Sequence, residues 1–339
     1  MSISQEASQP HIALFPSAGI GHLMPFLRLT TMLLSHDCKI PFPTIIRFEA
    51  TSRSSHLIHP LLASLTPPLS AIFADLVVAN GVGKAAVDLG VRNYIVSTTS
   101  LKFLSLMAYL PILTTSDAAK LANGAHKIEI TGMTPFPISS IPPPFFSADH
   151  GFTATLLSNV KALPYCNGII MNTFESFEPE SLSAIKNKRA LSNLPTILPI
   201  GLLETYELNI NQARYLPWLN DQPAESVVLL SFGSRTAMSK DQIRELRDGL
   251  ERSGHQFLWV LKTKKVDKDE NEEDLEEILG SLFLERTKDR CMVLKEWVNQ
   301  QDVLGHSAIG GFVSHCGWNS VMEAARNGVP VLAWPQHGD

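Results

Sequence analysis

The residues with the clearest chemical potential lie near the carboxyl end of the sequence, where a predicted strand ends at a histidine. The strand expected over Ile309–Ser314 runs into His315, and Gly317 leads into the helix expected over 318–326. The first turn of a helix has unpaired backbone N–H groups and about half a positive charge, a combination that binds phosphate. The segment therefore predicts a site for a phosphorylated ligand.

Polar side chains beside this turn would extend the site to a nucleotide. Asn319, Ser320 and Glu323 are spaced i, i+1 and i+4, so they share one helical face. A carboxylate there can accept hydrogen bonds from ribose hydroxyls, and the indole of Trp297 can stack on a base. This pattern favours a nucleoside-diphosphate site without a Walker lysine. The alternative is an ordinary core strand and helix, but core packing does not need these polar types in this register.

A second constellation lies near the amino end, where His22 follows a strand expected over His11–Phe15 and a turn ending at Gly21. This order places an imidazole at the carboxyl end of a sheet, where open α/β folds place their sites. Asp75, after the strand expected over 71–74, is the best candidate for a carboxylate that favours the protonated imidazole and fixes its tautomer. Taken alone, a histidine after a glycine turn is as often a helix-capping residue.

These residues need a scaffold of parallel strands covered by helices, and the hydropathy pattern predicts one. Short apolar runs alternate with amphipathic stretches, which indicates an α/β fold. The expected strands are 11–15, 71–74, 94–97, 168–171, 196–200, 227–232, 257–261, 291–294, 309–314 and 329–333. The expected helices between them include 23–35, 100–110, 240–252 and 318–326. Ser239 and Gln242 form a predicted capping box at the third helix, and Pro135–Phe146 is expected to be a loop over a surface or cleft.

The strand–helix rhythm pauses around residues 201–212, and a new series begins near Leu216. We therefore predict two doubly wound, Rossmann-like domains, 1–205 and 206–339, that face each other across a cleft. The first domain is expected to be shortened near 38–50, where prolines at 41 and 43 interrupt a run that begins like a strand. Both domains are expected to be incomplete.

Composition and charge exclude several classes of protein. The 339 residues are 45% hydrophobic and 18% charged, which indicates a globular chain with a large core. The net charge of −5 gives no basic excess for binding nucleic acid. The four cysteines are far apart and predict reduced thiols in a cytoplasmic protein. No secretory signal is expected, and the apolar run Leu101–Leu113 is shorter than the about 20 residues of a membrane span.

The segment Trp297–Asp339, with HCGWNS at 315–320, resembles the signature box of plant small-molecule UDP-glycosyltransferases, which have the GT-B fold. Asn299 departs from the proline that most members carry. The resemblance implies that Trp297 stacks on uracil, that Gln300 and Glu323 contact the nucleoside, and that the diphosphate and sugar are held further along the box. The donor-binding residues implied in this way are Ser234, Trp297, Val298, Gln300, His315, Gly317, Trp318, Asn319, Ser320, Glu323 and Asp339.

The same resemblance implies that His22 is the general base and that Asp75 orients it. Pro10–His36 and Leu229–Val260 look especially like plant C-glycosyltransferases that act on flavonoid-type phenols. The implied reaction is inverting transfer of a hexose from a UDP-sugar to a phenolic acceptor, forming a C- or O-glycoside. The partners are then the UDP-sugar and the phenol. A monomer is expected, with no cofactor and no metal, since the Asp267-Lys-Asp269 triplet lies in a charged loop without a flanking strand.

Two departures from the family set up a rival expectation. The stretch before Ala71 is far shorter than in relatives, and the chain stops at Asp339, before the glutamine that binds the sugar in the family. A shortened and truncated chain of this kind would be a nucleotide-binding remnant that holds UDP weakly and catalyses nothing. The aromatic and sulfur side chains that could line an acceptor pocket are equally typical of a core; they are Phe103, Met107, Phe145 and Phe146.

Overall fold

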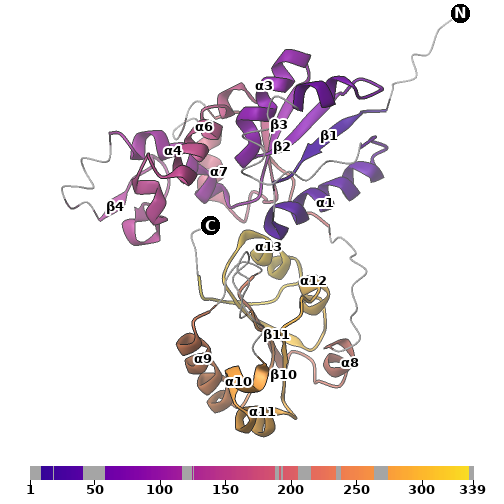
Figure 1. The fold of residues 1–339 in the computed structure, drawn as a ribbon, viewed down its shortest axis with the longest axis vertical. Coiled ribbons are helices and arrows are strands. Elements are labelled where there is room, and N and C mark those ends of the chain that lie inside the picture. Colours follow the sequence, from indigo (N-terminus) through magenta and orange to yellow (C-terminus); the bar gives the residue numbers. More distant parts are fainter. Residues whose placement is uncertain are drawn as a thin grey trace, which may run out of the picture. The chain divides into compact units, whose positions relative to one another are not determined.

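The computed structural model describes residues 9–17, 19–40, 58–116, 124, 126–187, 191, 194–204, 215–233, 238–262 and 274–335. The chain divides into two compact units, Met1–Tyr206 with Gly338, and Glu207–His337 with Asp339 (Figure 1). The predicted boundary between residues 205 and 206 lies outside the described residues.

The first unit is built on a five-stranded parallel sheet in the order β1-β2-β3-β6-β7. Its strands are β1 (Ile12–Phe15), β2 (Ala71–Asp75), β3 (Arg92–Ser97), β6 (Gly168–Met171) and β7 (Ile197–Pro199). Its helices are α1 (Ile20–Ser35), α3 (Ala79–Leu89), α4 (Leu101–Leu113), α6 (Gly151–Val160) and α7 (Pro179–Lys186), with 3-10 turns η1 (Leu76–Val78), η2 (Ile138–Ser140), η3 (Pro143–Phe146) and η4 (Leu163–Tyr165). Residues 127–128 (β4) and 136–137 (β5) pair as a short antiparallel ribbon.

Successive strand residues point to opposite faces of this sheet, and each face has its own core. On one face, Ile12 and Leu14 pack with Phe26 and Leu29 of α1. On the other face, Ala13 and the strand residues that point the same way pack with α3, α4 and α6. Because both faces are covered, the strands are mostly apolar, and the polar residues lie at their ends. The layers hold the carboxyl ends of β1, β2 and β3 side by side (Figure 1).

The second unit has a parallel sheet in the order β10-β9-β8-β11-β12. Its strands are β8 (Val227–Ser231), β9 (Gln256–Val260), β10 (Cys291–Leu294), β11 (Ile309–Ser314) and β12 (Val331–Ala333). Its helices are α8 (Tyr215–Asn220), α9 (Lys240–Ser253), α10 (Leu275–Leu279), α11 (Ser281–Thr287), α12 (Gln300–Leu304) and α13 (Trp318–Arg326). From β8 the chain adds β9 and β10 on one side of the sheet. It then crosses back and adds β11 and β12 on the other side of β8, which makes this unit doubly wound.

The α/β class with parallel, Rossmann-like sheets is thus confirmed, and every predicted strand is present within two residues of its predicted ends. In the described part of the first unit, however, the strands follow chain order across the sheet, without a reversal. The predicted shortening near 38–50 falls at the β1 edge: Lys39 pairs with His11 in an isolated bridge, and residues 41–57 lie outside the described residues.

Two local predictions need correction. The first helix begins at Ile20, not Leu23, so His22 lies within its first turn. The segment 135–146 is not a loop lying over a surface: it forms β5 and two 3-10 turns, and the side chains of Ile141 and Phe145 are buried in the core. Prolines prevented a regular helix here, but short 3-10 turns tolerate them and still bury apolar side chains.

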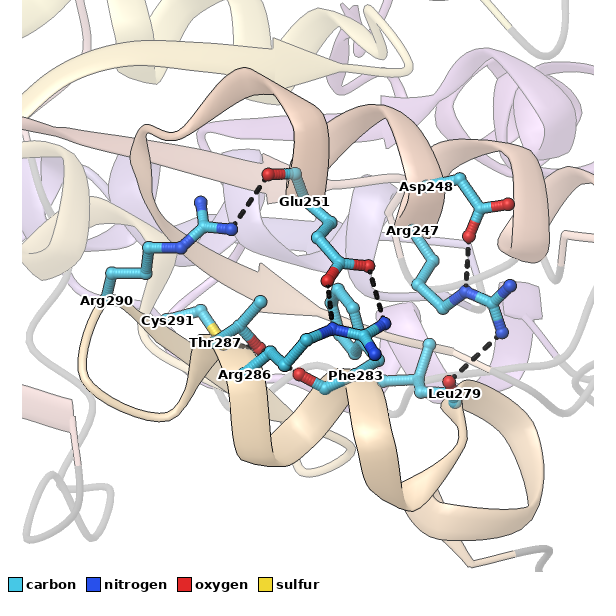
Figure 2. A network of polar contacts seen from close by, with 9 residues as sticks. All are labelled: Arg247, Asp248, Glu251, Leu279, Phe283, Arg286, Thr287, Arg290 and Cys291. Atoms are coloured by element: carbon cyan, nitrogen blue, oxygen red, sulfur yellow. Dashed lines mark hydrogen bonds and ion pairs between the residues drawn. The ribbon is translucent and has the colours of Figure 1, made fainter.

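Arginine side chains fasten α9 to the two helices that follow it in the second unit (Figure 2). Arg286 of α11 pairs with both carboxylate oxygens of Glu251, and Arg247 donates to the Leu279 carbonyl at the end of α10 at 3.1 Å. Arg290 donates to the carbonyls of Glu251 and His255. The guanidinium groups thereby satisfy carbonyls at helix ends that have no intrahelical partner.

Candidate active site

The predicted pair His22 and Asp75 is in contact in the first unit. Nδ1 of His22 lies 2.7 Å from Oδ2 of Asp75, and their side chains are 28% and 2% exposed. The histidine comes from the first turn of α1 and the aspartate from the end of β2, the strand next to β1. Because Nδ1 faces the carboxylate, Nε2 is the ring nitrogen that can exchange a proton with a substrate.

The Asp75 carboxylate is fixed by hydrogen bonds on both oxygens. Oδ1 accepts from the backbone N–H of Val77 at 3.0 Å, and Oδ2 accepts from the Ser17 hydroxyl at 3.3 Å. Asp75 thereby caps the η1 turn. A buried carboxylate held in this way keeps one orientation, so the imidazole beside it keeps one tautomer.

Ser17 and Thr98 join this cluster, although sequence reasoning did not single them out. The Thr98 hydroxyl lies 3.2 Å from Nδ1 of His22. Ser17 follows β1 and Thr98 follows β3, the two neighbours of β2. Their position directly after strands is the signal that could have found them, because the carboxyl ends of adjacent parallel strands meet at one edge.

The predicted phosphate turn is present in the second unit. β11 ends at Ser314, Cys316 adopts a left-handed φ of 66°, and Gly317 is the N-cap of α13. A left-handed non-glycine residue costs of order 1–3 kcal/mol and persists where the surroundings fix it. Here the N–H of Cys316 donates to the Ser314 hydroxyl at 3.1 Å. The first amides of α13 therefore follow a rigidly held turn.

Gly233 leaves space for the His315 ring. Its φ is +80°, and a Cβ built on it would lie 2.6 Å from Nε2 of His315. Glycine at this position therefore suits the left-handed backbone and also leaves room for the imidazole. Ser234, the residue implied as a phosphate contact, lies outside the described residues.

Gln300 and Glu323, two of the residues predicted to contact the nucleoside, are in contact with each other, and Glu323 lies on α13. Nε2 of Gln300 donates to Oγ of Ser320 at 2.9 Å and to Oε2 of Glu323 at 2.7 Å. Gln301, which sequence reasoning missed, is 3.5 Å from the other oxygen of Glu323. The carboxylate is thus oriented before any ligand arrives, which lowers the entropic cost of binding.

Asn299 makes contacts that proline could not make. Its backbone N–H donates to the Tyr215 hydroxyl at 3.3 Å, and its Nδ2 donates to Asp302 at 2.7 Å. Burial raises the pKa of Tyr215, which keeps the phenol neutral. The departure from the family's proline is therefore supported by a local hydrogen bond that needs an N–H group.

The remaining predicted donor residues differ in exposure. Trp297, His315, Gly317 and Asn319 are half-buried, so they retain some accessible surface. Val298 and Trp318 are only 4% and 8% exposed, so their side chains pack in the protein and can reach a ligand mainly through their backbone. Asp339 lies outside the described residues.

The aromatic residues considered for an acceptor pocket are mostly core. Met107 and Phe145 are buried, and Phe145 stacks between Phe103 and Phe152 at centroid distances of 5.9 and 6.2 Å. Phe146 is 39% exposed. Only Phe146, of the four named from the sequence, therefore presents a large apolar surface to solvent.

Within the described ranges no group of three or more histidine, cysteine or acidic side chains could hold a metal ion, and Asp267 and Asp269 lie outside those ranges. No helix that the structure describes is long and apolar enough to cross a membrane. The four cysteines all lie in described segments and none forms a disulfide.

The chain has two Rossmann-like units. One carries a histidine–aspartate pair, and the other carries a phosphate-type turn with the Gln300–Glu323 cluster. These features are those of a nucleotide-sugar-dependent transferase with the GT-B fold. Residues 203–339 match the family described as UDP-glucoronosyl and UDP-glucosyl transferase. The chain belongs to the UDP-glycosyltransferase family and is an enzyme of that class, which moves sugar from a UDP-sugar to a small-molecule acceptor.

Among relatives, UDP-glycosyltransferase 708C2 of Fagopyrum esculentum is 43% identical over 98% of this chain and 80% of its own length. UDP-glycosyltransferase CGT of Oryza sativa subsp. japonica is 39% identical over 98% and 79%. The crystal structure of LpCGTa in complex with UDP superposes with a TM-score of 0.81 at 38% identity, covering 98% of this chain and 81% of that one. The alignment with the Fagopyrum protein extends over 375 positions, so that relative carries residues without a counterpart here.

Proposed function

We propose that the chain transfers a hexose with inversion from a UDP-sugar to a phenolic, flavonoid-like acceptor, with His22 as the general base. The observation that carries this proposal is the 2.7 Å contact between His22 and the buried Asp75. A histidine held by a carboxylate at a strand end is equipped to accept a proton and to be stabilised as imidazolium. A relative described as an anthocyanidin 5,3-O-glucosyltransferase, whose named acceptor is a phenol, supports the phenolic acceptor.

In the proposed reaction, Nε2 of His22 removes the proton of an acceptor hydroxyl. The phenolate oxygen, or the ring carbon that shares its negative charge, attacks the anomeric carbon. The bond from that carbon to the β-phosphate oxygen breaks, and UDP leaves with the electron pair. After carbon attack, the proton on that ring carbon passes to water, the ring regains aromaticity as a phenolate, and the His22 imidazolium returns its proton to the phenolate oxygen. General base catalysis of this kind contributes about 10²–10⁴-fold.

The second unit would bind the donor. The helix dipole and first amides of α13, together with His315, Asn319 and Ser320, would hold the diphosphate and stabilise its charge as UDP leaves. This role for α13 removes the need for a metal or cofactor. Ser234 and Asp339 complete the proposed donor set, with domain 1–205 binding the acceptor and 206–339 the UDP-sugar. We propose that the enzyme acts as a monomer in the cytoplasm.

The test is an incubation of the chain with UDP-glucose and a dihydroxyphenol, read by mass spectrometry before and after acid hydrolysis. A product that survives acid is a C-glycoside, and one that acid removes is an O-glycoside. UDP-dependent thermal stabilisation without product would instead favour the catalytically inactive remnant.

The matched variant is His22→Ala. It should lower transfer by about 10²–10⁴-fold, because the general base is lost, and should leave the affinity for UDP unchanged, because the donor residues lie in the other unit. Calorimetric titration with UDP is the control. Normal turnover of the alanine variant would contradict the assignment of His22 as the base.

A further inference from the structure

We propose that Asn159 is a positioning residue for the reaction, because it holds the turn that presents Asp75 to His22. This inference rests on the proposed function, in which the two side chains act as a pair. Asn159 lies on α6, far along the chain from either of them, and its side chain is only 4% exposed.

The Asn159 amide uses both its donors and its acceptor on described partners. Nδ2 donates to the carbonyl of Val77 at 2.9 Å and to that of Thr155 at 3.0 Å, while Oδ1 accepts from the N–H of Asn80 at 2.9 Å. Neighbouring Ser158 adds a second link, since its hydroxyl accepts from the Asn80 side chain at 2.8 Å. The Asn159 side chain therefore forms hydrogen bonds to the backbone on both sides of residue 78.

Val77 connects these hydrogen bonds of Asn159 to the His22–Asp75 pair. Its carbonyl accepts from Asn159, and its N–H donates to Oδ1 of Asp75 at 3.0 Å. The other oxygen of Asp75 lies 2.7 Å from Nδ1 of His22. A series of three hydrogen bonds thus runs from α6 through the η1 turn and the carboxylate to the imidazole.

The turn needs such an external hold. η1 is a 3-10 turn of three residues, and 3-10 geometry makes poorer hydrogen bonds than an α-helix. An error of about 1 Å in the position of a catalytic group costs up to about 100-fold in rate. The carboxamide supplies two N–H donors and one acceptor oxygen, which matches the three contacts here, so leucine, aspartate or alanine at this position would leave at least one partner unsatisfied.

If Asn159 had a purely structural role, its loss would lower stability without a specific effect on kcat. Asn93 provides the matched control for this alternative. Asn93 is also 4% exposed, lies on β3, and donates to the Cys166 sulfur near the amino end of the strand, away from Asp75. Asn93→Ala removes a buried amide of the same size. It should lower the unfolding midpoint without changing kcat.

The experiment measures kcat and the KM for UDP-glucose in Asn159→Ala and Asn93→Ala, together with the downfield NMR resonance of the His22 Nδ1 proton. We expect Asn159→Ala to lower kcat by about 10- to 100-fold with an unchanged KM, and to shift or broaden the His22 resonance. An unchanged kcat and resonance in Asn159→Ala would overturn the proposal, as would an equal loss of kcat in Asn93→Ala.

Asn159→Asp keeps the test valid if the alanine variant does not fold. The carboxylate can still accept from Asn80, at the favourable amino end of α3, but it cannot donate to Val77. We expect a folded protein with reduced kcat, and wild-type kcat would count against the proposal. His22→Ala separates the proposed function from the positioning role of Asn159. If His22→Ala keeps its turnover, the proposed function fails. The His22 resonance, compared between the wild type and Asn159→Ala, still tests whether Asn159 positions the pair.

Discussion

The imidazole of His315 occupies the space where a side chain on residue 233 would be. Glycine is required there for two separate reasons: the backbone is left-handed, and the nearest ring atom would be 2.6 Å from a Cβ. The two reasons can be separated, since Gly254 has a similar φ of +70° with nothing within 4 Å of a Cβ.

We therefore compare Gly233→Ala with Gly254→Ala. Both should lose roughly 1 kcal/mol of stability from the left-handed backbone. Gly233→Ala should in addition displace the His315 ring and weaken UDP binding by about 10- to 100-fold, the cost of losing a hydrogen bond to a charged group. Calorimetric titration with UDP and urea unfolding measure the two effects. Equal UDP affinities in the two variants would show that the ring position does not matter for the donor.

At the scale of elements, α4 depends on a carboxylate that comes from outside the helix. Oε1 of Glu178 accepts from the N–H of Leu101 at 2.8 Å, and Oε2 accepts from the Thr173 hydroxyl at 2.8 Å. The Thr98 that contacts His22 lies just before this helix. Glu178 therefore fixes the start of α4, which is the end of this helix that lies closest in sequence to Thr98 and its contact with His22.

Burial raises the pKa of Glu178 above its ordinary value of 4.5, although its hydrogen bonds oppose the shift. The folded protein therefore binds this proton more tightly than the unfolded chain, so the group contributes stability at low pH that is lost as pH rises through the folded pKa. Glu178→Gln does not titrate. We expect the stability of the wild type relative to this variant to decrease as the pH rises from the ordinary pKa of 4.5 through the raised pKa of the folded protein.

Urea unfolding of both proteins across this range measures the difference. The exposed control is Glu175→Gln, in which the side chain lost is 75% exposed and pairs with Lys186. Its effect should vary little with pH by comparison. A stability difference for Glu178 that increases with pH would contradict the expected sign.

At the scale of the whole molecule, the two units carry different parts of the chemistry. The described residues that we propose to bind the donor belong to the second unit, whereas His22, Asp75 and the residues that hold them belong to the first. A ligand that binds only the folded protein stabilises it by about 2.7 kcal/mol at a hundredfold excess over Kd.

Hydrogen exchange with and without UDP should show where this stabilisation acts. We expect slower amide exchange over residues 294–333, which include β11 and α13, and little change over β1, β2 and β3. The variant His22→Ala, in which transfer is expected to be lowered, should give the same pattern. Protection confined to the first unit would contradict the assignment of the donor site.

The sequence by itself determined the elements and the chemistry of the candidate residues. Strand and helix positions follow from hydropathy with a local period, so β6, β10 and β11 have their predicted ends and the Ser239 capping box is present. Weakly patterned helices such as α3 and α6 were missed, because their buried residues are mostly small or polar.

Only the tertiary structure decided which residues meet. Ser17 reaches Asp75 across 58 positions, Thr98 reaches His22 across 76, and Asn299 reaches Tyr215 across 84. These contacts depend on the order of strands in a sheet and on which helix covers which face, and no local pattern encodes either. The sequence therefore named His22 and Asp75 as a candidate pair, while the packing of distant elements supplied the groups that hold the two side chains in place.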